Sequence, residues 1–182
     1  MNMYQSLRRQ GRPGKSIMII AAVILTVCTS ATVITSADFS GEWKLNEQKS
    51  DLGQFGGRGV AKTMKVTSSD AKGISIERTS TNQNGEAVVR KEALTFDGKE
   101  SESTGGFGNS TRKATAKWSD DGQSMIINAV MTLDRNGEKM EIKQNETWKL
   151  GDGGQTLTIE SNSSSSFGES TMKLVYEKGK KA

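Results

Sequence analysis

Apolar and polar residues alternate along most of the chain after residue 38. Met64 and Val66 lie on either side of Lys65, and the same spacing recurs at Leu157 and Ile159. This period-two pattern predicts β-strands that each bury one face and expose the other. The strands are expected near residues 39–45, 59–68, 72–80, 86–96, 110–118, 123–133, 139–150, 154–161 and 168–178, with a further short strand near 99–104.

Turn-forming dipeptides separate these segments, and no helical stripe follows residue 38. The dipeptides are Asn84-Gly85, Asp97-Gly98, Asp121-Gly122, Asn136-Gly137 and Asp152-Gly153. Because Asn-Gly and Asp-Gly tolerate the positive φ angles of tight hairpins, they predict antiparallel strands joined by short turns. We therefore expect an all-β fold. An antiparallel up-and-down β-barrel of about 8–10 strands is favoured because closure leaves no exposed sheet edge, and a two-sheet β-sandwich is the alternative.

Three segments rich in glycine or serine interrupt the alternation and are expected to be loops. They are residues 53–59, 105–108 and 161–168, and each carries one phenylalanine: Phe55, Phe107 and Phe167. Such an aromatic side chain either folds back to plug a barrel end or forms a lip around a ligand entrance.

The first 37 residues have the composition of an export signal. They contain four basic residues and no acidic residue, and residues 17–27 form an uncharged apolar run that is followed by small residues up to Ala37. A basic region, an apolar region and a small-residue cleavage site make up a secretory signal peptide. We therefore expect residues 1–37 to be a signal peptide and residues 38–182 to be an exported barrel domain, either periplasmic or secreted.

Two alternatives stay open for this leader. Residues 17–35 are uncharged and approach the length of about 20 residues that spans a bilayer, so they would form an uncleaved anchor helix. Cys28 follows Leu25-Thr26-Val27, which resembles the start of a lipobox, although the residue before the cysteine should be small. In each case the domain lies outside the cytoplasm, and membrane contact is made only through the leader.

The charge of the chain is concentrated in this leader. The chain carries 25 basic and 21 acidic residues, and removing the four basic residues of the leader leaves 21 of each. The domain after residue 37 is therefore formally neutral. A neutral domain lacks the basic footprint that nucleic acids require, so we expect no nucleic-acid partner.

The residue types that most often carry catalysis are scarce in the domain. The chain has no histidine, and its single cysteine is Cys28 in the leader. The commonest general base and the commonest metal ligands are therefore missing. Glycosidase chemistry needs two carboxylates facing one cleft, and Glu146 has no evident inward partner in the alternation pattern. We expect no enzymatic activity, no cofactor and no metal site.

The start of the domain resembles the lipocalins. Gly41-Glu42-Trp43 is similar to the Gly-x-Trp signature that opens lipocalin chains, and residues 38–46 look like the start of lipocalin-like exported bacterial proteins of unassigned function. Residues 146–150 and 154–159 are similar to the same group. The resemblance implies a β-barrel in which Trp43 closes one end, either as a structural plug or in contact with a ligand.

Several polar residues lie an even number of positions from an apolar residue of the same strand, so both side chains should point to the same face. They are therefore candidates for the barrel interior. Arg78 lies on the face of Ile76, Arg112 on that of Ala114, and Gln144 and Glu146 on that of Trp148. A buried charge is costly unless it is paired, so we predict an ion pair of Arg78 or Arg112 with Glu146. The alternative is that these residues lie at the rims of the barrel, where this spacing does not imply burial.

These patterns favour a monomeric binding protein that holds a small apolar or amphipathic ligand. The residues expected to contact the ligand are Trp43, Met64, Ile76, Arg78, Arg112, Met140, Gln144 and Glu146. Met125, Ile127, Met131, Ile142 and Met172 would extend an adaptable lining. The same side chains would also fill a solid core, so the alternative is a ligand-free structural or interaction module of the cell envelope.

Overall fold

The computed structural model describes residues 36–54, 56–57, 59–70, 72–106, 110–135 and 137–179. The signal peptide predicted at 1–37, including Cys28, lies almost entirely outside the described residues. Within them, no helix is long and apolar enough to cross a membrane.

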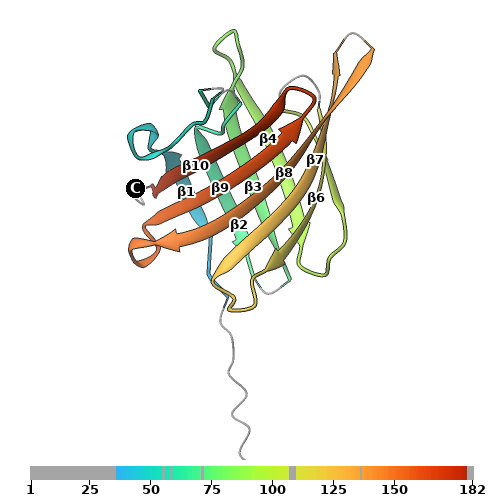
Figure 1. The fold of residues 1–182 in the computed structure, drawn as a ribbon. Coiled ribbons are helices and arrows are strands. Elements are labelled where there is room, and N and C mark those ends of the chain that lie inside the picture. The colour runs from blue at the N-terminus through green and yellow to red at the C-terminus, as the bar shows by residue number, and fades with distance from the viewer. Residues whose placement is uncertain are drawn as a thin grey trace, which may run out of the picture. The chain divides into compact units, whose positions relative to one another are not determined.

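Ten antiparallel strands make up nearly all of the regular structure (Figure 1). They are β1 (Gly41–Leu45), β2 (Thr63–Ser69), β3 (Gly73–Thr81), β4 (Ala87–Thr95), β5 (Ser101–Thr104), β6 (Thr111–Trp118), β7 (Ser124–Arg135), β8 (Glu138–Gly151), β9 (Thr156–Ser165) and β10 (Gly168–Lys178). In the described residues, two short 3₁₀ helices, η1 (Glu47–Lys49) and η3 (Asp152–Gly154), lie between strands. The all-β prediction is confirmed, including the short strand near 99–104.

The strands form one nearly closed up-and-down barrel. The hydrogen-bonded order is β4-β3-β2-β1-β10-β9-β8-β7-β6-β5, so strands that follow one another in sequence pair, except β4 and β5, and β1 pairs with β10. Trp43 lies opposite Lys178 in this closing pair. The order ends at β4 on one side and at β5 on the other, and these two strands are in contact along a seam. The barrel is therefore observed in place of the alternative sandwich.

The turns follow the predicted chemistry, but one predicted loop is mostly strand. Gly85, between β3 and β4, has a φ of 82°, which a residue with a side chain rarely adopts. The serine-rich segment 161–168 was expected to be a loop, yet β9 continues to Ser165. It does so because its backbone is paired on both sides: Ser161 lies opposite Glu146 of β8 and opposite Met172 of β10.

The two ends of the barrel are packed differently. The plugged end carries the β2–β3, β4–β5, β6–β7 and β8–β9 connections, and aromatic side chains fill it. Phe39 stacks on Trp118 with 5.7 Å between ring centroids and meets the edge of Trp148 at 5.8 Å. Phe96 contacts Trp118 at 5.1 Å. The opposite end carries the β1–β2, β3–β4, β5–β6, β7–β8 and β9–β10 connections and is called the cavity end below.

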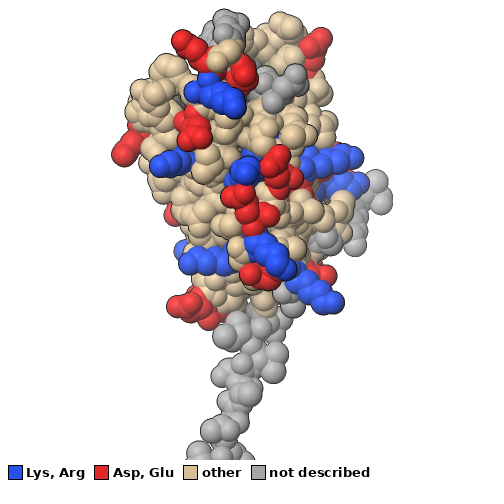
Figure 2. All heavy atoms as spheres, turned by 90° about the vertical axis from the view of Figure 1, so that its right-hand side faces the viewer, with Lys and Arg blue, Asp and Glu red and all other residues tan. Residues whose placement is uncertain are grey.

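Charges of both signs are mixed on the outer surface. On the face shown in Figure 2, basic and acidic side chains are interspersed and do not gather by sign. Elsewhere on the barrel, exposed ion pairs link neighbouring strands, such as Lys65 with Glu42 at 3.2 Å and Lys91 with Glu77 at 3.2 Å. Exposed pairs of this kind contribute little to stability. The face shown in Figure 2 therefore offers no patch of a single sign to a charged partner.

Candidate functional site: the barrel cavity

The cavity end of the barrel encloses a hollow of about 660 Å³. Its apolar wall consists of residues from β7, β8 and β10, namely Met131, Leu133, Met140, Ile142, Met172 and Leu174. In the β7–β8 ladder Met131 lies opposite Ile142 and Leu133 lies opposite Met140, so alternate residues of both strands face inward together. The volume falls within the range of roughly 300–1,000 Å³ that is typical of small-molecule sites.

A second wall of the cavity is lined with hydroxyl groups. Ser161, Ser163 and Ser165 are alternate residues of β9, and Ser170 lies beside them on β10. Gln144 of β8 donates from Nε2 to Ser161 Oγ at 3.2 Å, and Ser163 Oγ donates to the carbonyl oxygen of Ser170 at 3.3 Å. The uncharged polar lining of β9 therefore lies between the apolar residues of β8 and those of β10.

The floor of the cavity is a cluster of buried charges. Arg112 donates from Nη1 to Glu92 Oε2 at 2.9 Å and from Nη2 to Glu146 Oε1 at 3.0 Å. Arg78 donates from Nη2 to Glu146 Oε2 at 2.7 Å. The side chains of Arg112 and Glu146 are each only 3% exposed. Since two guanidinium groups face two carboxylates, the cluster itself is neutral.

Electrostatics keeps this cluster ionised. Burial opposes the charge of Glu146, but the attraction of Arg78 and Arg112 outweighs it and lowers the pKa of Glu146 from 4.5 to about 2. Burial alone would lower the pKa of Arg78, and Glu146 and Glu92 reverse this, so the pKa of Arg78 is raised. The Arg78 guanidinium also lies 5.2 Å from the centroid of the Trp148 ring, a favourable cation–π arrangement.

Two buried polar atoms at the floor have no hydrogen-bond partner among the described residues. They are the donor Arg78 Nε and the acceptor Glu92 Oε1. The two groups are close, because Arg78 Nε lies 3.7 Å from the other oxygen of Glu92. A buried polar atom without a partner is costly, and a hydroxyl group or a water molecule can accept from one atom and donate to the other. Both atoms have almost no accessible surface, so a group in the cavity would reach them only after the side chains of the floor moved.

The structure divides the predicted ligand-contacting residues into two sets. Arg78, Arg112, Met140, Gln144 and Glu146 line the cavity. Trp43, Met64 and Ile76 do not, because they are buried in the packed core. Trp43 donates from Nε1 to the carbonyl oxygen of Phe39 at 2.9 Å, and Lys178 Nζ lies 5.2 Å from its ring.

The wider lining predicted from the sequence divides in the same way. Met131, Ile142 and Met172 line the cavity, whereas Met125 and Ile127 are completely buried in the core. Of the three loop aromatics, Phe55 and Phe107 lie outside the described residues. Phe167 is 71% exposed and lines the rim of the cavity, so it lies at a lip and does not plug the barrel.

The predicted pairing of arginine with Glu146 is confirmed, since both Arg78 and Arg112 contact it. These residues are inside the barrel and not at a rim. The expectation that Glu146 has no inward partner carboxylate is wrong, because Glu92 shares Arg112 with it. Glu92 and Arg90 lie two and four positions before the buried Leu94. This spacing in the sequence could have placed both side chains on the inner face of β4.

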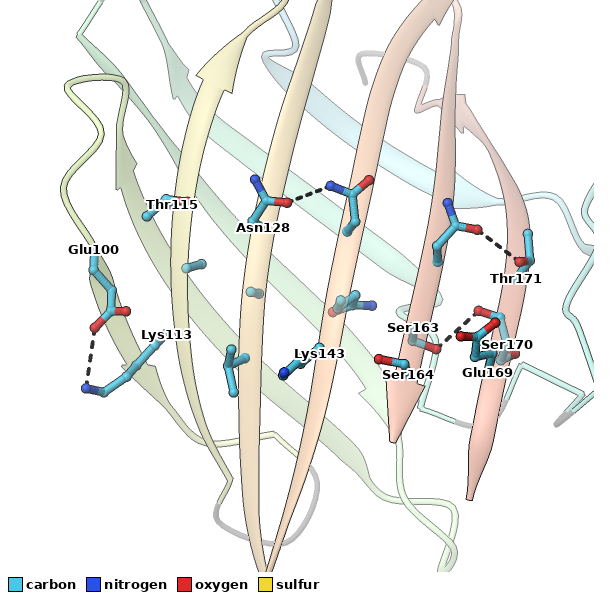
Figure 3. Close-up of a pocket in the computed structure, with 16 residues that line it drawn as sticks. Glu100, Lys113, Thr115, Asn128, Lys143, Ser163, Ser164, Glu169, Ser170 and Thr171 are labelled. Atoms are coloured by element: carbon cyan, nitrogen blue, oxygen red, sulfur yellow. Dashed lines mark hydrogen bonds and ion pairs between the residues drawn. The ribbon is translucent and has the colours of Figure 1, made fainter. Parts of the chain in front are cut away.

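A second hollow, of about 620 Å³, lies on the outer face of β6 to β10 (Figure 3). Polar residues form one row across these five strands, in the order Thr115, Asn128, Asn145, Asn162 and Thr171. Within the row Asn145 Nδ2 donates to Asn128 Oδ1 at 2.6 Å, and Thr171 Oγ1 donates to Asn162 Oδ1 at 2.9 Å. These contacts satisfy several of the polar groups within the sheet itself.

The comparisons with known proteins are sparse. No family model and no curated protein matches the chain. Among solved structures, the chain is similar to zebrafish ileal bile acid-binding protein in complex with cholic acid, with 14% sequence identity and a TM-score of 0.46. The match covers 78% of this chain and 98% of the zebrafish chain. A likeness of this degree does not assign a ligand to this chain. Within the described residues, no group of three or more Cys, Asp or Glu side chains could hold a metal ion.

Proposed function

We propose that this chain is an exported, non-catalytic binding protein whose barrel holds a small amphipathic molecule. The observation that carries the proposal is the cavity of about 660 Å³ at one end of an otherwise well-packed barrel. Small-molecule sites are typically concave and mostly apolar, with a few polar groups that fix orientation. This cavity has that composition, because Met131, Met140 and Met172 face it together with the charged floor.

The chemistry of the walls supports an amphipathic ligand over a purely apolar one. The apolar wall would bury a hydrocarbon part, and thioether side chains adapt to irregular shapes. The hydroxyl groups of the serine wall offer hydrogen bonds that a hydrocarbon cannot use. A ligand that carries a polar group would use them.

The floor also supports a binding role over a catalytic one. Glycoside hydrolysis needs one carboxylic acid that gives up a proton. The pKa of Glu146 is about 2, so this group is ionised at neutral pH and cannot act as the acid. Arg112 bridges Glu146 and Glu92, which fixes both carboxylates in place. We propose that the cluster sets the shape and polarity of the cavity and performs no proton transfer.

Export is inferred from the sequence of the leader, whereas the resemblance to lipocalin-like exported proteins is carried by residues 38–46, 146–150 and 154–159 of the domain. The alternative function is a ligand-free interaction module of the envelope. The outer hollow on β6 to β10, with its row of asparagine and threonine side chains, is the observation that favours it. Such a module would use the outer face of the sheet and would not need access to the interior.

Adjacent substitutions on β9 distinguish the two functions. Ser163→Phe places an aromatic ring in the cavity, whereas Ser164→Phe places the same ring on the outer face. The full-length protein is titrated with the uncharged fluorescent probe N-phenyl-1-naphthylamine. Interior binding predicts that Ser163→Phe weakens affinity by about tenfold or more, while Ser164→Phe stays within about twofold of the unmodified protein. Equal affinities in the two variants, with the β-sheet circular dichroism spectrum preserved, would contradict the proposal.

A further inference from the structure

We propose that Arg90 is an anion-binding residue of this cavity and that the ligand is a singly charged anionic amphiphile. The inference rests on the proposed function and specifies the chemical class of the ligand. Its basis is the inventory of charges that face the cavity, together with the surroundings of the Arg90 side chain.

Among the described residues, the lining of the cavity carries one more cation than anions. Three arginines, Arg78, Arg90 and Arg112, line it together with two carboxylates, Glu92 and Glu146. The ion pairs use both carboxylates for Arg78 and Arg112. Every Asp and Glu of the chain lies within the described residues, and none of them is within ion-pair distance of Arg90. The excess positive charge therefore belongs to Arg90.

Neutral groups hold the Arg90 side chain across the seam between β4 and β5. The carbonyl oxygen of Gly105 accepts hydrogen bonds from Arg90 Nε at 3.3 Å and from Nη2 at 2.6 Å. Nη2 also donates to Ser110 Oγ. The guanidinium group is therefore fixed in position without being neutralised. An Arg90 that is fixed before the ligand arrives loses little further freedom when an anion binds.

The backbone beside Arg90 is shaped to fit the guanidinium group. Gly106 has a φ of 78°, and a Cβ atom at this position would lie 2.7 Å from Arg90 Nη2. A side chain at this position would require the flexible end of Arg90 to shift, and the positive φ itself favours glycine. Gly106 lines the cavity together with Arg90, which makes this pair a built part of the cavity wall.

One edge of Arg90 is available to a ligand. Within the described part of the chain, the one hydrogen-bond contact of Nη1 is to a thioether, Met131 Sδ at 3.6 Å, and sulfur is a weak acceptor. An oxyanion is a much stronger acceptor and would replace this contact with charge-assisted hydrogen bonds. Met131 also belongs to the apolar wall. An acid group on Nη1 therefore leaves the attached hydrocarbon next to Met131, Met140 and Ile142.

The charge on the opposite strand strengthens the case for an anion. Arg78 lies directly across from Arg90 in the β3–β4 ladder, and like charges in facing positions repel. The neutral floor cluster compensates Arg78 but leaves Arg90 partly buried beside it. Burial lowers the pKa of Arg90, although an arginine stays protonated in proteins. A bound anion relieves this unfavourable environment, whereas a bound cation worsens it.

The test compares three ligands of equal length with different head groups. Decanoic acid, decan-1-ol and decylamine compete with N-phenyl-1-naphthylamine in the full-length protein, Arg90→Gln and Lys91→Gln. Lys91 is the matched control, because its exposed side chain points away from the cavity and pairs with Glu77. We expect the unmodified protein and Lys91→Gln to prefer the acid over the alcohol by about tenfold or more. Arg90→Gln is expected to lose most of this preference.

The outcomes separate the inference from the function on which it rests. If the alcohol competes as well as the acid in the unmodified protein, or if Arg90→Gln keeps the full preference, Arg90 is not an anion site and the binding function stands. If the probe itself does not enter the cavity, the proposed function fails. If Arg90→Gln does not fold, Arg90→Lys replaces it in the test, because lysine keeps the charge but loses the paired contacts with Gly105. We expect Arg90→Lys to prefer the acid less strongly than the unmodified protein does, and still to bind the acid more tightly than the amine.

Discussion

Trp148 donates its indole N–H to Glu146 at 2.8 Å, and the two residues lie two positions apart on the same face of β8. This contact joins the aromatic packing of the plugged end to the charged floor of the cavity. Glu146 receives two further donors, Arg78 on the same oxygen and Arg112 on the other. One buried carboxylate thus holds together residues from β3, β6 and β8.

Neutralising this carboxylate should therefore destabilise the barrel. Glu146→Gln leaves Arg78 and Arg112 buried with one carboxylate between them, and breaking a buried pair in this way costs about 3–5 kcal/mol. The free energy of unfolding is measured by urea denaturation. Glu160→Gln is the control, because Glu160 is exposed on the outer face of β9 and should change stability by no more than about 0.5 kcal/mol. Equal stabilities of the two variants would show that the floor cluster is not a structural link.

The pKa of Glu146 gives a second test of the cluster. Its folded-state pKa is about 2, against 4.5 for an ordinary glutamate. Because the folded value is depressed, the stability that Glu146 contributes is present above pH 4.5 and is lost as the pH falls toward 2. Carbon-13 NMR of labelled glutamate, assigned by comparison with Glu146→Gln, follows this carboxyl directly. A carboxyl signal of Glu146 that titrates near the ordinary value would contradict the account.

Trp43 should contribute to stability and not to ligand affinity. Its indole N–H bonds the carbonyl oxygen of Phe39 inside the packed core, away from the cavity. Trp43→Phe leaves that carbonyl without its partner and should lower the free energy of unfolding by about 1–3 kcal/mol. Affinity for N-phenyl-1-naphthylamine should stay within about twofold of the unmodified protein. A folded Trp43→Phe variant with strongly reduced affinity would place the probe near Trp43.

The mass of the protein in the cell envelope tests the leader. We expect the denatured chain to begin at Asp38, because cleavage after Ala37 follows from the small residues there. An intact chain would instead support the anchor at residues 17–35. Additional acyl mass on Cys28 would identify a lipoprotein. Each of the three outcomes keeps the barrel outside the cytoplasm, so a full-length chain recovered from the cytoplasm would contradict export.

Much of the fold could be predicted because alternation and turn chemistry are local signals. The strand containing Met64 and Val66 and the turn at Asn84-Gly85 both lie where the sequence places them. The serine-rich end of β9 was missed because serine is typical of loops. Its strand conformation depends on backbone pairing with β8 and β10, which no single segment reveals.

The site could be predicted in part for the same reason. Within each strand, an even spacing from an apolar residue identified Arg78, Arg112 and Glu146 as candidates for the barrel interior. It missed Arg90 and Glu92, because the adjacent Val88 and Val89 obscure which face of β4 is apolar.

The sequence also could not tell which end of the barrel is hollow. Met64 and Met140 occupy similar alternating patterns, yet Met64 lies in the core and Met140 in the cavity. The difference depends on how the aromatic side chains at the plugged end pack together in three dimensions.

Native mass spectrometry measures whether the cavity holds a small molecule. The protein is expressed from the full-length sequence, purified from the envelope of the expressing cell and weighed in native and denatured states, before and after incubation with decanoic acid. We expect the native mass to exceed the chain mass by that of a small ligand, and the excess should disappear on denaturation. A tightly folded monomer whose native mass equals that of the bare chain, even after incubation, would contradict the account.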